Sequence, residues 1–296
     1  MEYIPAKTII TKTKKTPYWF DCDYNMNIYK GCCHGCIYCD SRSECYRIND
    51  FDTVRGKENC LVLIRDELRR KVKTGVISMG AMSDPYNPFE KELKLTRNAL
   101  ELINAYEFGV GIATKSNLII RDIDILKDIQ SHSPVLAKIT ITCADDNLSK
   151  KIERNVCPSS ERFEAIEKLS SAGIFNGILL MPVLPFINDT LENITTIVNR
   201  AKECGAKFIY ADFGVTLRQN QREYFFDRLR EIFPNENLVA KYISKYGNNY
   251  HCGSPQYRQL YKVFSQMCEK NGIAYKMSDI NTLFRRGYQN NQLSFF

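Results

Sequence analysis

The sequence predicts an α/β protein built on a parallel sheet. Six short apolar runs are bounded by Gly, Pro or Asp and are mostly unbroken, as in strands that are buried on both faces. Segments with helical periodicity separate them, and from the second run onward the runs start at intervals of about 30–37 residues, the length of one strand–helix–strand unit. This alternation favours a parallel sheet but leaves open whether the sheet is open or curled into a barrel. The expected strands are Tyr24–Tyr29, Val76–Met82, Phe108–Thr114, Lys138–Thr142, Ile174–Met181 and Lys207–Phe213.

Four of the expected helices follow from apolar residues that recur with helical spacing. Two lie between strands, at Leu95–Tyr106 and around Phe163–Ser170, and the second of these is expected to stop at Gly173. Two more, Gln221–Phe233 and Pro255–Asn271, lie after the last strand, where the strand–helix alternation fades. The C-terminal part of the chain is therefore expected to be a separate, smaller extension.

A fifth helix carries an apolar stripe from Leu191 to Ala201 and has recognisable signals at both ends. Asp189 is followed three residues later by Glu192, which predicts a capping box at the start of the helix. Gly205 marks the expected end, because glycine adopts the left-handed conformation that commonly terminates helices.

These elements divide the chain into four expected parts, with a boundary near residue 215. A Gly-, Asn- and Tyr-rich loop at 246–250 separates the two C-terminal helices, and no internal repeat is present. The parts are an N-terminal segment at 1–19, the strand–helix region at 20–215, the C-terminal extension at 216–290 and a tail at 291–296.

Composition indicates a globular cytoplasmic protein. Of 296 residues, 44% are apolar and 25% are charged, and no stretch approaches the roughly 20 apolar residues that span a bilayer. The N-terminal residues Met1–Pro5 lack the charged and then apolar pattern of a signal peptide, so we expect no membrane partner. The net charge of +7 permits attraction to nucleic acid but does not require it.

The chain contains twelve cysteines, but only those between Cys32 and Cys45 form a cluster. In a reducing compartment, clustered cysteines hold metal or carry redox chemistry more often than they form disulfides. The others stand singly and are expected to be structural thiols. These isolated cysteines are Cys22, Cys60, Cys143, Cys157, Cys204, Cys252 and Cys268.

Three interpretations of this cluster compete. A structural zinc site needs four ligands, and the fourth would have to be His34, Cys33 or Cys45, although no second cysteine pair occurs at zinc-ribbon spacing. A ferredoxin-type site would use a C-x2-C-x2-C run, but the further cysteine and proline expected after it are missing. The third interpretation is a C-x3-C-x2-C pattern of Cys32, Cys36 and Cys39, with an aromatic residue before the last cysteine.

The third pattern, placed just after a first strand, resembles the motif of the radical S-adenosylmethionine (SAM) superfamily. The resemblance implies that Cys32, Cys36 and Cys39 hold three irons of a [4Fe–4S] cluster and leave the fourth iron for SAM. It further implies reductive cleavage of SAM to a 5′-deoxyadenosyl radical, with a reduced flavodoxin or ferredoxin as electron donor. The cofactors supply this chemistry, and the protein orients them and excludes competing reactions.

Further motifs resemble the branch that is related to spore photoproduct lyase, whose members are often labelled DNA repair photolyases. They are Gly80–Tyr86, Thr114–Ser116 and Met181–Pro185, each at an expected strand end, together with Ser160–Gly173. The resemblance covers about residues 20–215 and, more loosely, 246–275. It implies an incomplete (β/α)6 barrel of the TIM type with a small C-terminal α/β extension.

Roles carried over from the family by position give a set of expected SAM contacts. Tyr38 is expected beside the cluster and the adenine, the backbone of Gly80–Met82 beside the SAM amino group, and Lys115 beside the SAM carboxylate. The cofactor-binding residues implied in this way are Tyr38, Gly80, Ala81, Met82, Ser83, Lys115, Thr142 and Met181.

Three of these residues have simpler alternatives. Thr142 is expected to reach the ribose or carboxylate and Met181 to pack on the adenine, but both could be ordinary packing at strand ends. Lys115 could equally be a solvated charge.

The sequence departs from the family at one catalytic position. Spore photoproduct lyase carries a cysteine hydrogen donor just before the Ser-Asp of its second-strand loop, whereas Met82 precedes Ser83 here. Reversal of a dimer by that route is therefore not expected. Cys143 is an alternative donor, and a buried structural thiol is the competing interpretation.

The last five residues, Gln292, Leu293, Ser294, Phe295 and Phe296, resemble the short peptide with which bacterial repair and replication proteins bind the sliding clamp. Such a peptide acts as a hydrophobic anchor in a preformed pocket, and docking on the protein's own surface is the alternative. Together these features predict a radical SAM enzyme, a lyase or another radical-based enzyme, that acts on a DNA lesion or modified base. The alternatives are radical SAM modification of a peptide or small metabolite, and an iron–sulfur or zinc module that binds nucleic acid without catalysis.

Overall fold

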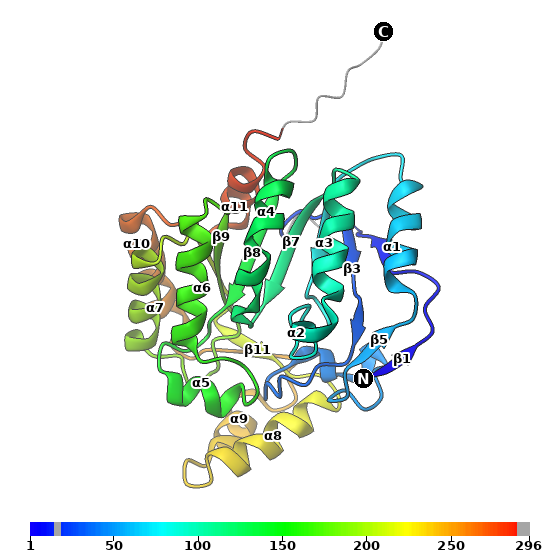
Figure 1. The fold of residues 1–296 in the computed structure, drawn as a ribbon. Coiled ribbons are helices and arrows are strands. Elements are labelled where there is room, and N and C mark those ends of the chain that lie inside the picture. Colours follow the sequence, from blue (N-terminus) through cyan, green and yellow to red (C-terminus); the bar gives the residue numbers. More distant parts are fainter. Residues whose placement is uncertain (15–18, 289–296) are drawn as a thin grey trace.

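The computed structural model describes residues 1–14 and 19–288 and contains a seven-stranded central sheet (Figure 1). The strand order is β10-β9-β8-β7-β6-β3-β2, so six parallel strands follow one another in sequence order and β2 pairs antiparallel at one edge. The sheet strands are β2 (Ile10–Lys12), β3 (Tyr24–Met26), β6 (Val76–Met79), β7 (Gly109–Thr114), β8 (Val135–Thr140), β9 (Asn176–Leu180) and β10 (Phe208–Ala211). All residues of β6, β8 and β9 are buried, as the unbroken apolar runs predict.

An outer layer of helices covers the sheet, with at least one helix between most successive strands (Figure 1). The longer helices bury an apolar stripe; α3, for example, buries Ala99, Leu100 and Ile103. The helices of this layer are α1 (Cys60–Arg69), α2 (Glu90–Leu93), α3 (Leu95–Ala105), α4 (Ile123–Gln130), α5 (Asp146–Ile152), α6 (Ser159–Ser171) and α7 (Leu191–Glu203). The predicted partial barrel of strand–helix units is therefore confirmed. None of the helices in the described residues is long and apolar enough to cross a membrane.

The start of α7 differs from the prediction. Thr190, not Asp189, is the N-cap, and its side chain accepts a hydrogen bond from the Asn193 backbone N–H at 3.1 Å. The Asp189 carboxylate instead accepts from Phe186 N at 2.7 Å and from Ser254 Oγ at 2.6 Å. Both residues can cap a helix, and the tertiary contact to Ser254 decides between them.

The expected strand Tyr24–Tyr29 is divided between two sheets. β3 belongs to the central sheet, whereas β4 (Tyr29–Lys30) pairs with β5 (Arg55–Lys57), which also pairs with β1 (Glu2–Ile4). This small sheet ends at Gly31 and directs the chain into the cysteine cluster. Gly31 has a φ of +82°, and a Cβ there would lie 2.3 Å from Thr53 O, so only glycine fits this turn.

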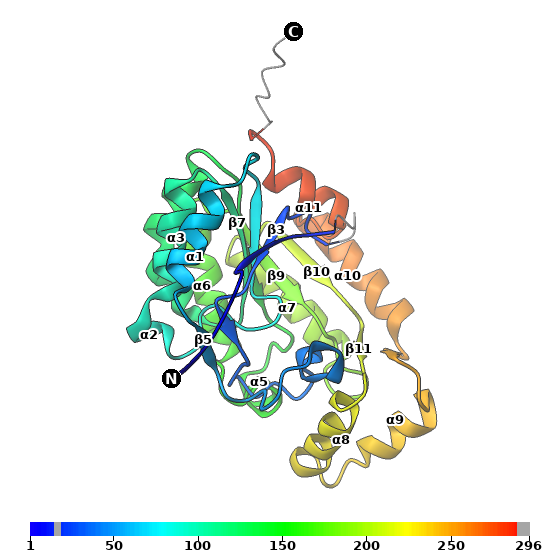
Figure 2. The ribbon, with the colours of Figure 1, turned by 90° about the vertical axis from the view of Figure 1, so that its right-hand side faces the viewer.

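The C-terminal part packs against both the site end and the edge of the barrel (Figure 2). It contains β11 (Gly214–Thr216), α8 (Gln221–Ile232), α9 (Leu238–Tyr246), β12 (His251–Gly253), α10 (Tyr257–Asn271) and α11 (Met277–Phe284). Helix α10 packs on α7, and after it Ala274 extends the sheet at β10, where Ile209 N donates to Ala274 O at 2.9 Å. Helix α9, helix α11 and the antiparallel pair of strands β11 and β12 were not predicted. Helix α9 and the two strands are short, and their amphipathic patterns are too brief to recognise in the sequence.

Candidate active site

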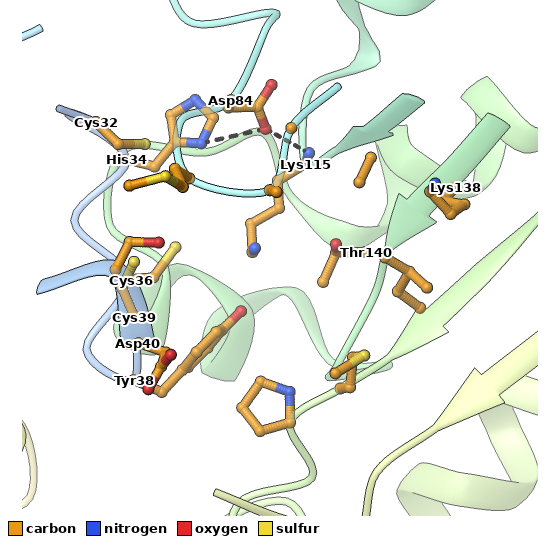
Figure 3. A pocket seen from close by; sticks show the side chains of 18 of the residues that line it. Cys32, His34, Cys36, Tyr38, Cys39, Asp40, Asp84, Lys115, Lys138 and Thr140 are labelled. Carbon is orange, nitrogen blue, oxygen red and sulfur yellow. Dashed lines mark hydrogen bonds and ion pairs between the residues drawn. The ribbon is translucent and has the colours of Figure 1, made fainter. Parts of the chain in front are cut away.

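A cavity of about 370 Å³ opens at the carboxyl ends of the parallel strands, the usual position of active sites in barrels of this type (Figure 3). Strand ends supply one part of its wall and the cysteine cluster supplies another. The residues bordering it include Cys32, Cys36, Tyr38, Cys39, Gly80, Ala81, Met82, Ser83, Lys115 and Met181. The structure thus brings together the three predicted cluster ligands and seven of the eight predicted SAM contacts.

The three cysteines lie in a loop that backbone hydrogen bonds hold from both sides. Cys32 N donates to Phe51 O at 2.8 Å, and Ile37 N donates to Ile152 O at 3.0 Å. Cys32 and Cys36 are buried and Cys39 is partly exposed, all bordering the same cavity. Three thiols on one wall suit a four-iron cluster that keeps one iron free of protein ligands, because cysteine thiolates are the usual ligands of such clusters.

A single-ion site has less support in the same region. No group of three or more His, Cys, Asp or Glu side chains in the described residues is arranged to hold one metal ion. Zinc bound to thiolates at about 2.3 Å would require its ligands to converge on one point. The three thiols are one ligand short of the four that a structural zinc site needs, and their number matches a four-iron cluster with one open iron.

A buried ion pair supports the cysteine loop from behind. Glu153 pairs with the backbone of Cys36 as an isolated β-bridge, accepts a hydrogen bond from the Tyr38 hydroxyl and forms an ion pair with Arg162 at 2.6 Å. Arg162 also donates to the carbonyls of Cys157 at 2.8 Å and Thr140 at 2.9 Å. This network connects the cysteine loop to α6 and to the end of β8. Sequence reasoning missed it, since nothing in the local pattern shows that Glu153 and Arg162 are buried together.

Charges around the loop shift the titration of its neighbours. Burial alone would raise the pKa of Glu153, but Arg162 and Lys115 outweigh it and lower the pKa of that carboxyl. Burial likewise raises the pKa of Cys36, with Lys115 acting against it. For Cys32 the balance is reversed, because the hydrogen bond and charge of His34 outweigh burial and lower the pKa of the thiol.

Asp84 joins the loop after β6 to the end of β7. Its Oδ1 accepts from Thr114 Oγ1 at 2.7 Å and from Tyr86 N at 2.9 Å, and its Oδ2 accepts from Lys115 N at 2.8 Å. His34 Nδ1 lies 3.6 Å from the same Oδ2 (Figure 3). One carboxylate therefore orients the second strand loop, the third strand end and the cysteine loop. Asp84 belongs to a motif that the sequence analysis quoted, but its role became visible only in the structure.

Lys115 directs its side chain toward the cysteines (Figure 3). Its ammonium lies 5.6 Å from the centre of the Tyr38 ring. Burial opposes its charge, but the negative charges of Cys36 and Glu153 outweigh burial and raise the pKa of Lys115. Lys115 is therefore a half-buried cation whose side chain points toward the predicted cluster ligands.

Gly80 lets two strand ends approach closely. Its φ is +93°, and a Cβ at this position would lie 1.9 Å from Ala113 O. Ser83 continues the same loop and donates through Oγ to Gly31 O at 2.5 Å. The backbone of this loop is consequently held at the cavity wall.

Two predicted site residues do not reach the cavity. Thr142 is completely buried, and its carbonyl accepts from the side-chain amides of Asn188 and Asn193. Cys143 lies behind the wall, where burial, with Glu153 adding to it, raises the pKa of its thiol to about 12. Thr140 borders the cavity instead, because β8 ends at Thr140 and the chain then turns away.

Other residues at the cavity were not predicted. Three of them, Trp19, Asp212 and Tyr250, reach it from segments that are distant in sequence from the predicted site residues, so no local pattern identified them. Three others, Asp84, Lys138 and Thr140, lie within four residues of the predicted Ser83 or Thr142.

Comparison with known proteins agrees with this geometry. The family model of the radical SAM superfamily matches residues 26–199. Since the match covers more than half of the 296 residues, the chain belongs to the radical SAM superfamily. It is accordingly a radical SAM enzyme, and the cofactors of its family are a [4Fe–4S] cluster and SAM.

Two proteins that are similar to this chain in sequence are uncharacterized proteins. MJ0683 of Methanocaldococcus jannaschii is 30% identical over 230 residues, which cover 75% of this chain and 83% of that protein. Rv2578c of Mycobacterium tuberculosis is 28% identical over 244 residues, which cover 80% of this chain and 71% of that protein.

Among solved structures, spore photoproduct lyase complexed with dinucleoside spore photoproduct matches with a TM-score of 0.63 and 13% identity, over 93% of this chain and 81% of that chain. A mutant of the same lyase matches with a TM-score of 0.65, also at 13% identity and over 93% of this chain and 80% of that chain. At 13% identity this likeness shows a shared fold alone.

Proposed function

We propose that this radical SAM enzyme acts on a base of a nucleic acid, a DNA lesion or a modified base, that is turned out into the cavity. The observation that carries the proposal is a pair of aromatic side chains bordering the cavity, Trp19 and Tyr250, which are 42% and 48% exposed. Proteins that act on single bases stack the displaced base on such side chains.

Three further observations support this function. Spore photoproduct lyase, whose fold this chain shares, has been solved with a dinucleoside photoproduct. Arg218 donates to the Tyr250 hydroxyl at 2.7 Å, which places a cation next to an exposed ring. The net charge of +7 favours approach to phosphates.

Within this proposal, the chain's own residues bind and orient the cofactors. Cys32, Cys36 and Cys39 hold the cluster, which together with SAM supplies a 5′-deoxyadenosyl radical when both are bound. Lys115 is close enough to the cysteines to neutralise a carboxylate placed beside them. The backbone of Gly80–Met82 and the ring of Tyr38 bound the space next to the cluster.

Neither the position of the lyase cysteine nor the predicted alternative donor, Cys143, presents a thiol to the cavity. Met82 occupies the position of the lyase cysteine and borders the cavity, whereas Cys143 lies outside the wall. The reaction proposed here therefore differs from that of spore photoproduct lyase in how the substrate radical is quenched.

The ligand assignment is tested by anaerobic cluster reconstitution, followed by incubation with SAM and dithionite and detection of 5′-deoxyadenosine. We expect Cys36→Ala to lose both the cluster and SAM cleavage. Cys143→Ala is the matched control and should retain both. Retention of either property by Cys36→Ala would show that the ligands are misassigned.

The nucleic-acid assignment is tested by fluorescence anisotropy with a labelled single-stranded oligodeoxynucleotide. Because stacking on one aromatic side chain contributes about 1–3 kcal/mol per base, Trp19→Ala should weaken binding by roughly 5- to 150-fold. Val72→Ala, at a fully exposed residue between α1 and β6, should leave binding unchanged. Equal affinity of all three proteins would contradict the proposal and favour a peptide or small metabolite as substrate.

Recruitment by the sliding clamp is a separate proposal, since Gln292–Phe296 lie outside the described residues. The last described residue, Tyr288, donates through its hydroxyl to Gln130 O at 2.5 Å, so the chain is anchored just before this motif. Deletion of the five residues should abolish capture by the clamp and leave SAM cleavage unchanged. Undiminished capture would contradict recruitment through the tail.

A reduced flavodoxin or ferredoxin is proposed as the electron donor. Its ability to support SAM cleavage is to be compared directly with that of dithionite.

A further inference from the structure

Lys138 is a buried lysine that the functions described so far do not use. Its side chain projects from the middle of β8 into the barrel, is 1% exposed and borders the cavity. Its ammonium nitrogen has no hydrogen-bond partner among the described residues. The contact it does make is with the face of Phe20, whose ring centre is 4.7 Å away.

The carboxylates that border the same cavity are, by contrast, already engaged. Asp40 lies 3.1 Å from the Arg218 guanidinium, Asp212 lies 3.7 Å from His251, and Asp84 accepts the hydrogen bonds described above. Lys115 is surrounded by Cys36, Cys39 and Glu153. Among the described residues at the cavity, Lys138 is therefore a cation whose charge is not balanced by a carboxylate.

A glycine in the neighbouring strand β7 leaves room for the Lys138 side chain. A Cβ on Gly111 would lie 3.3 Å from Lys138 Nζ and 3.1 Å from Cys22 Sγ, so a larger residue at position 111 would crowd the ammonium. Thr140 lies two residues further along β8, on the same face of the strand, and also borders the cavity. The wall thus presents a cation and a hydroxyl side by side.

Keeping an unpaired charge in a protein interior is energetically costly. Even after relaxation, the desolvation penalty of such an ion exceeds what one cation–π contact returns. Burial accordingly lowers the pKa of Lys138, while the Cys22 thiol acts in the opposite direction. The presence of a lysine that destabilises the ligand-free protein in this way is explained if a bound ligand compensates its charge.

We propose that Lys138 binds an anionic oxygen group of the substrate, a phosphate or a carboxylate, inside the barrel. Figure 3 places Lys138 across the cavity from Cys32, Cys36 and Cys39, with Lys115 beside the cysteines. Lys115 is thus placed for a carboxylate of the cofactor and Lys138 for an anion further away. The inference rests on the proposed function only in that the cavity holds the substrate.

The test uses the reconstituted, SAM-loaded enzyme and isothermal titration calorimetry with pairs of probes that differ in charge. The pairs are thymidine 5′-monophosphate with thymidine, and N-acetylglycine with N-acetylglycinamide. We expect wild type to bind the charged member of at least one pair about tenfold more tightly. Lys138→Met should abolish this preference and leave the neutral probe within about twofold. Lys138→Arg should retain it, because arginine remains charged. The matched control is Lys150→Met, at an exposed lysine in α5, which should behave as wild type.

The outcomes separate this inference from the nucleic-acid proposal. A preference confined to the N-acetylglycine pair, and lost in Lys138→Met, would support the anion site while pointing to a small carboxylate substrate. The inference is overturned if wild type shows no preference in either pair, or if Lys138→Met keeps the preference. It is also overturned if Lys138→Met weakens SAM binding as strongly as probe binding, since the anion would then belong to SAM.

Discussion

The Glu153 carboxylate and the Arg162 guanidinium lie 2.6 Å apart with both side chains almost fully excluded from solvent. The pair sits directly behind the cysteine loop, where Glu153 bridges to the backbone of Cys36 and holds the Tyr38 hydroxyl. Neither side chain borders the cavity, so we expect the pair to influence the site by positioning the cysteine loop.

Replacing one member of this buried ion pair should lower the free energy of unfolding far more than replacing one member of an exposed ion pair. We expect Arg162→Met to lower the free energy of unfolding by about 3–5 kcal/mol, because it leaves a buried carboxylate without a partner. The matched control is Arg154→Met, which breaks the exposed Arg154–Glu231 pair and should cost less than about 1 kcal/mol.

Urea unfolding and the iron bound after reconstitution test this prediction together. A positioning role requires the iron content of Arg162→Met to fall even at temperatures where the variant stays folded. Full iron occupancy in a folded variant would reduce the pair to a purely structural role.

Gly80 and Gly173 allow a steric effect to be separated from a backbone effect. Their φ values are +93° and +78°, but an added Cβ meets Ala113 O at 1.9 Å in Gly80 and nothing within 4 Å in Gly173. Both alanine variants should carry the cost of a left-handed residue, about 1 kcal/mol. Only Gly80→Ala must also move two strand ends apart. It should therefore lose SAM affinity by at least tenfold in equilibrium dialysis, while Gly173→Ala keeps wild-type affinity. Similar losses in the two variants would assign the effect to backbone strain alone.

The buried charge of Lys138 should be visible in the stability of the empty protein. Replacing it by methionine removes an uncompensated ion and fills a similar volume, so Lys138→Met should raise the free energy of unfolding of the ligand-free protein by about 1–4 kcal/mol. Differential scanning calorimetry should show this as an increase in Tm of a few degrees. Lys150→Met should shift Tm by much less, since its lysine is solvated. A lower Tm for Lys138→Met would mean that the protein already accommodates the ammonium well.

The same residue predicts a pH dependence with a defined sign. Burial lowers the pKa of Lys138 from its usual value near 10.5, with Cys22 as the opposing titratable neighbour. The ammonium is lost as pH rises through this lowered value, so the preference of wild type for thymidine 5′-monophosphate over thymidine should decline at alkaline pH. The phosphate itself stays dianionic there, because its second pKa is about 6. Lys138→Arg should keep the preference over the same range. A parallel decline in both proteins would exclude Lys138 as the titrating group.

Stability should change in the opposite direction over that range. Between the lowered folded-state pKa of Lys138 and its usual value, the unfolded chain binds more protons than the folded chain, so the free energy of unfolding of wild type rises with pH. The difference between wild type and Lys138→Met should therefore shrink as pH increases.

The parts of the fold that could be predicted from the sequence are those that local patterns encode. Strands buried on both faces appear as unbroken apolar runs, and the cysteine spacing is a local signal, so both were recognised. Glu153 and Arg162 gave no signal, since their burial arises only when α6 packs behind the cysteine loop. Thr142 was predicted as a SAM contact because the sequence placed the end of this strand at Thr142, whereas β8 ends two residues earlier, at Thr140.

The residues that close the barrel lie in and just after α11, near the C-terminal end of the described region. Arg285, just after α11, donates to the Asp21 carbonyl and lies 3.3 Å from the Asp23 carboxylate, while Met277 Sδ accepts from Phe20 N at 3.2 Å. During synthesis on the ribosome, the segment that precedes β3 must therefore wait for nearly the whole chain before it finds its partners. The cysteine loop depends in the same way on Gln221, whose side chain donates to Tyr38 O at 3.3 Å. The loop that receives the iron therefore acquires its final shape only after the chain has been made at least as far as residue 221.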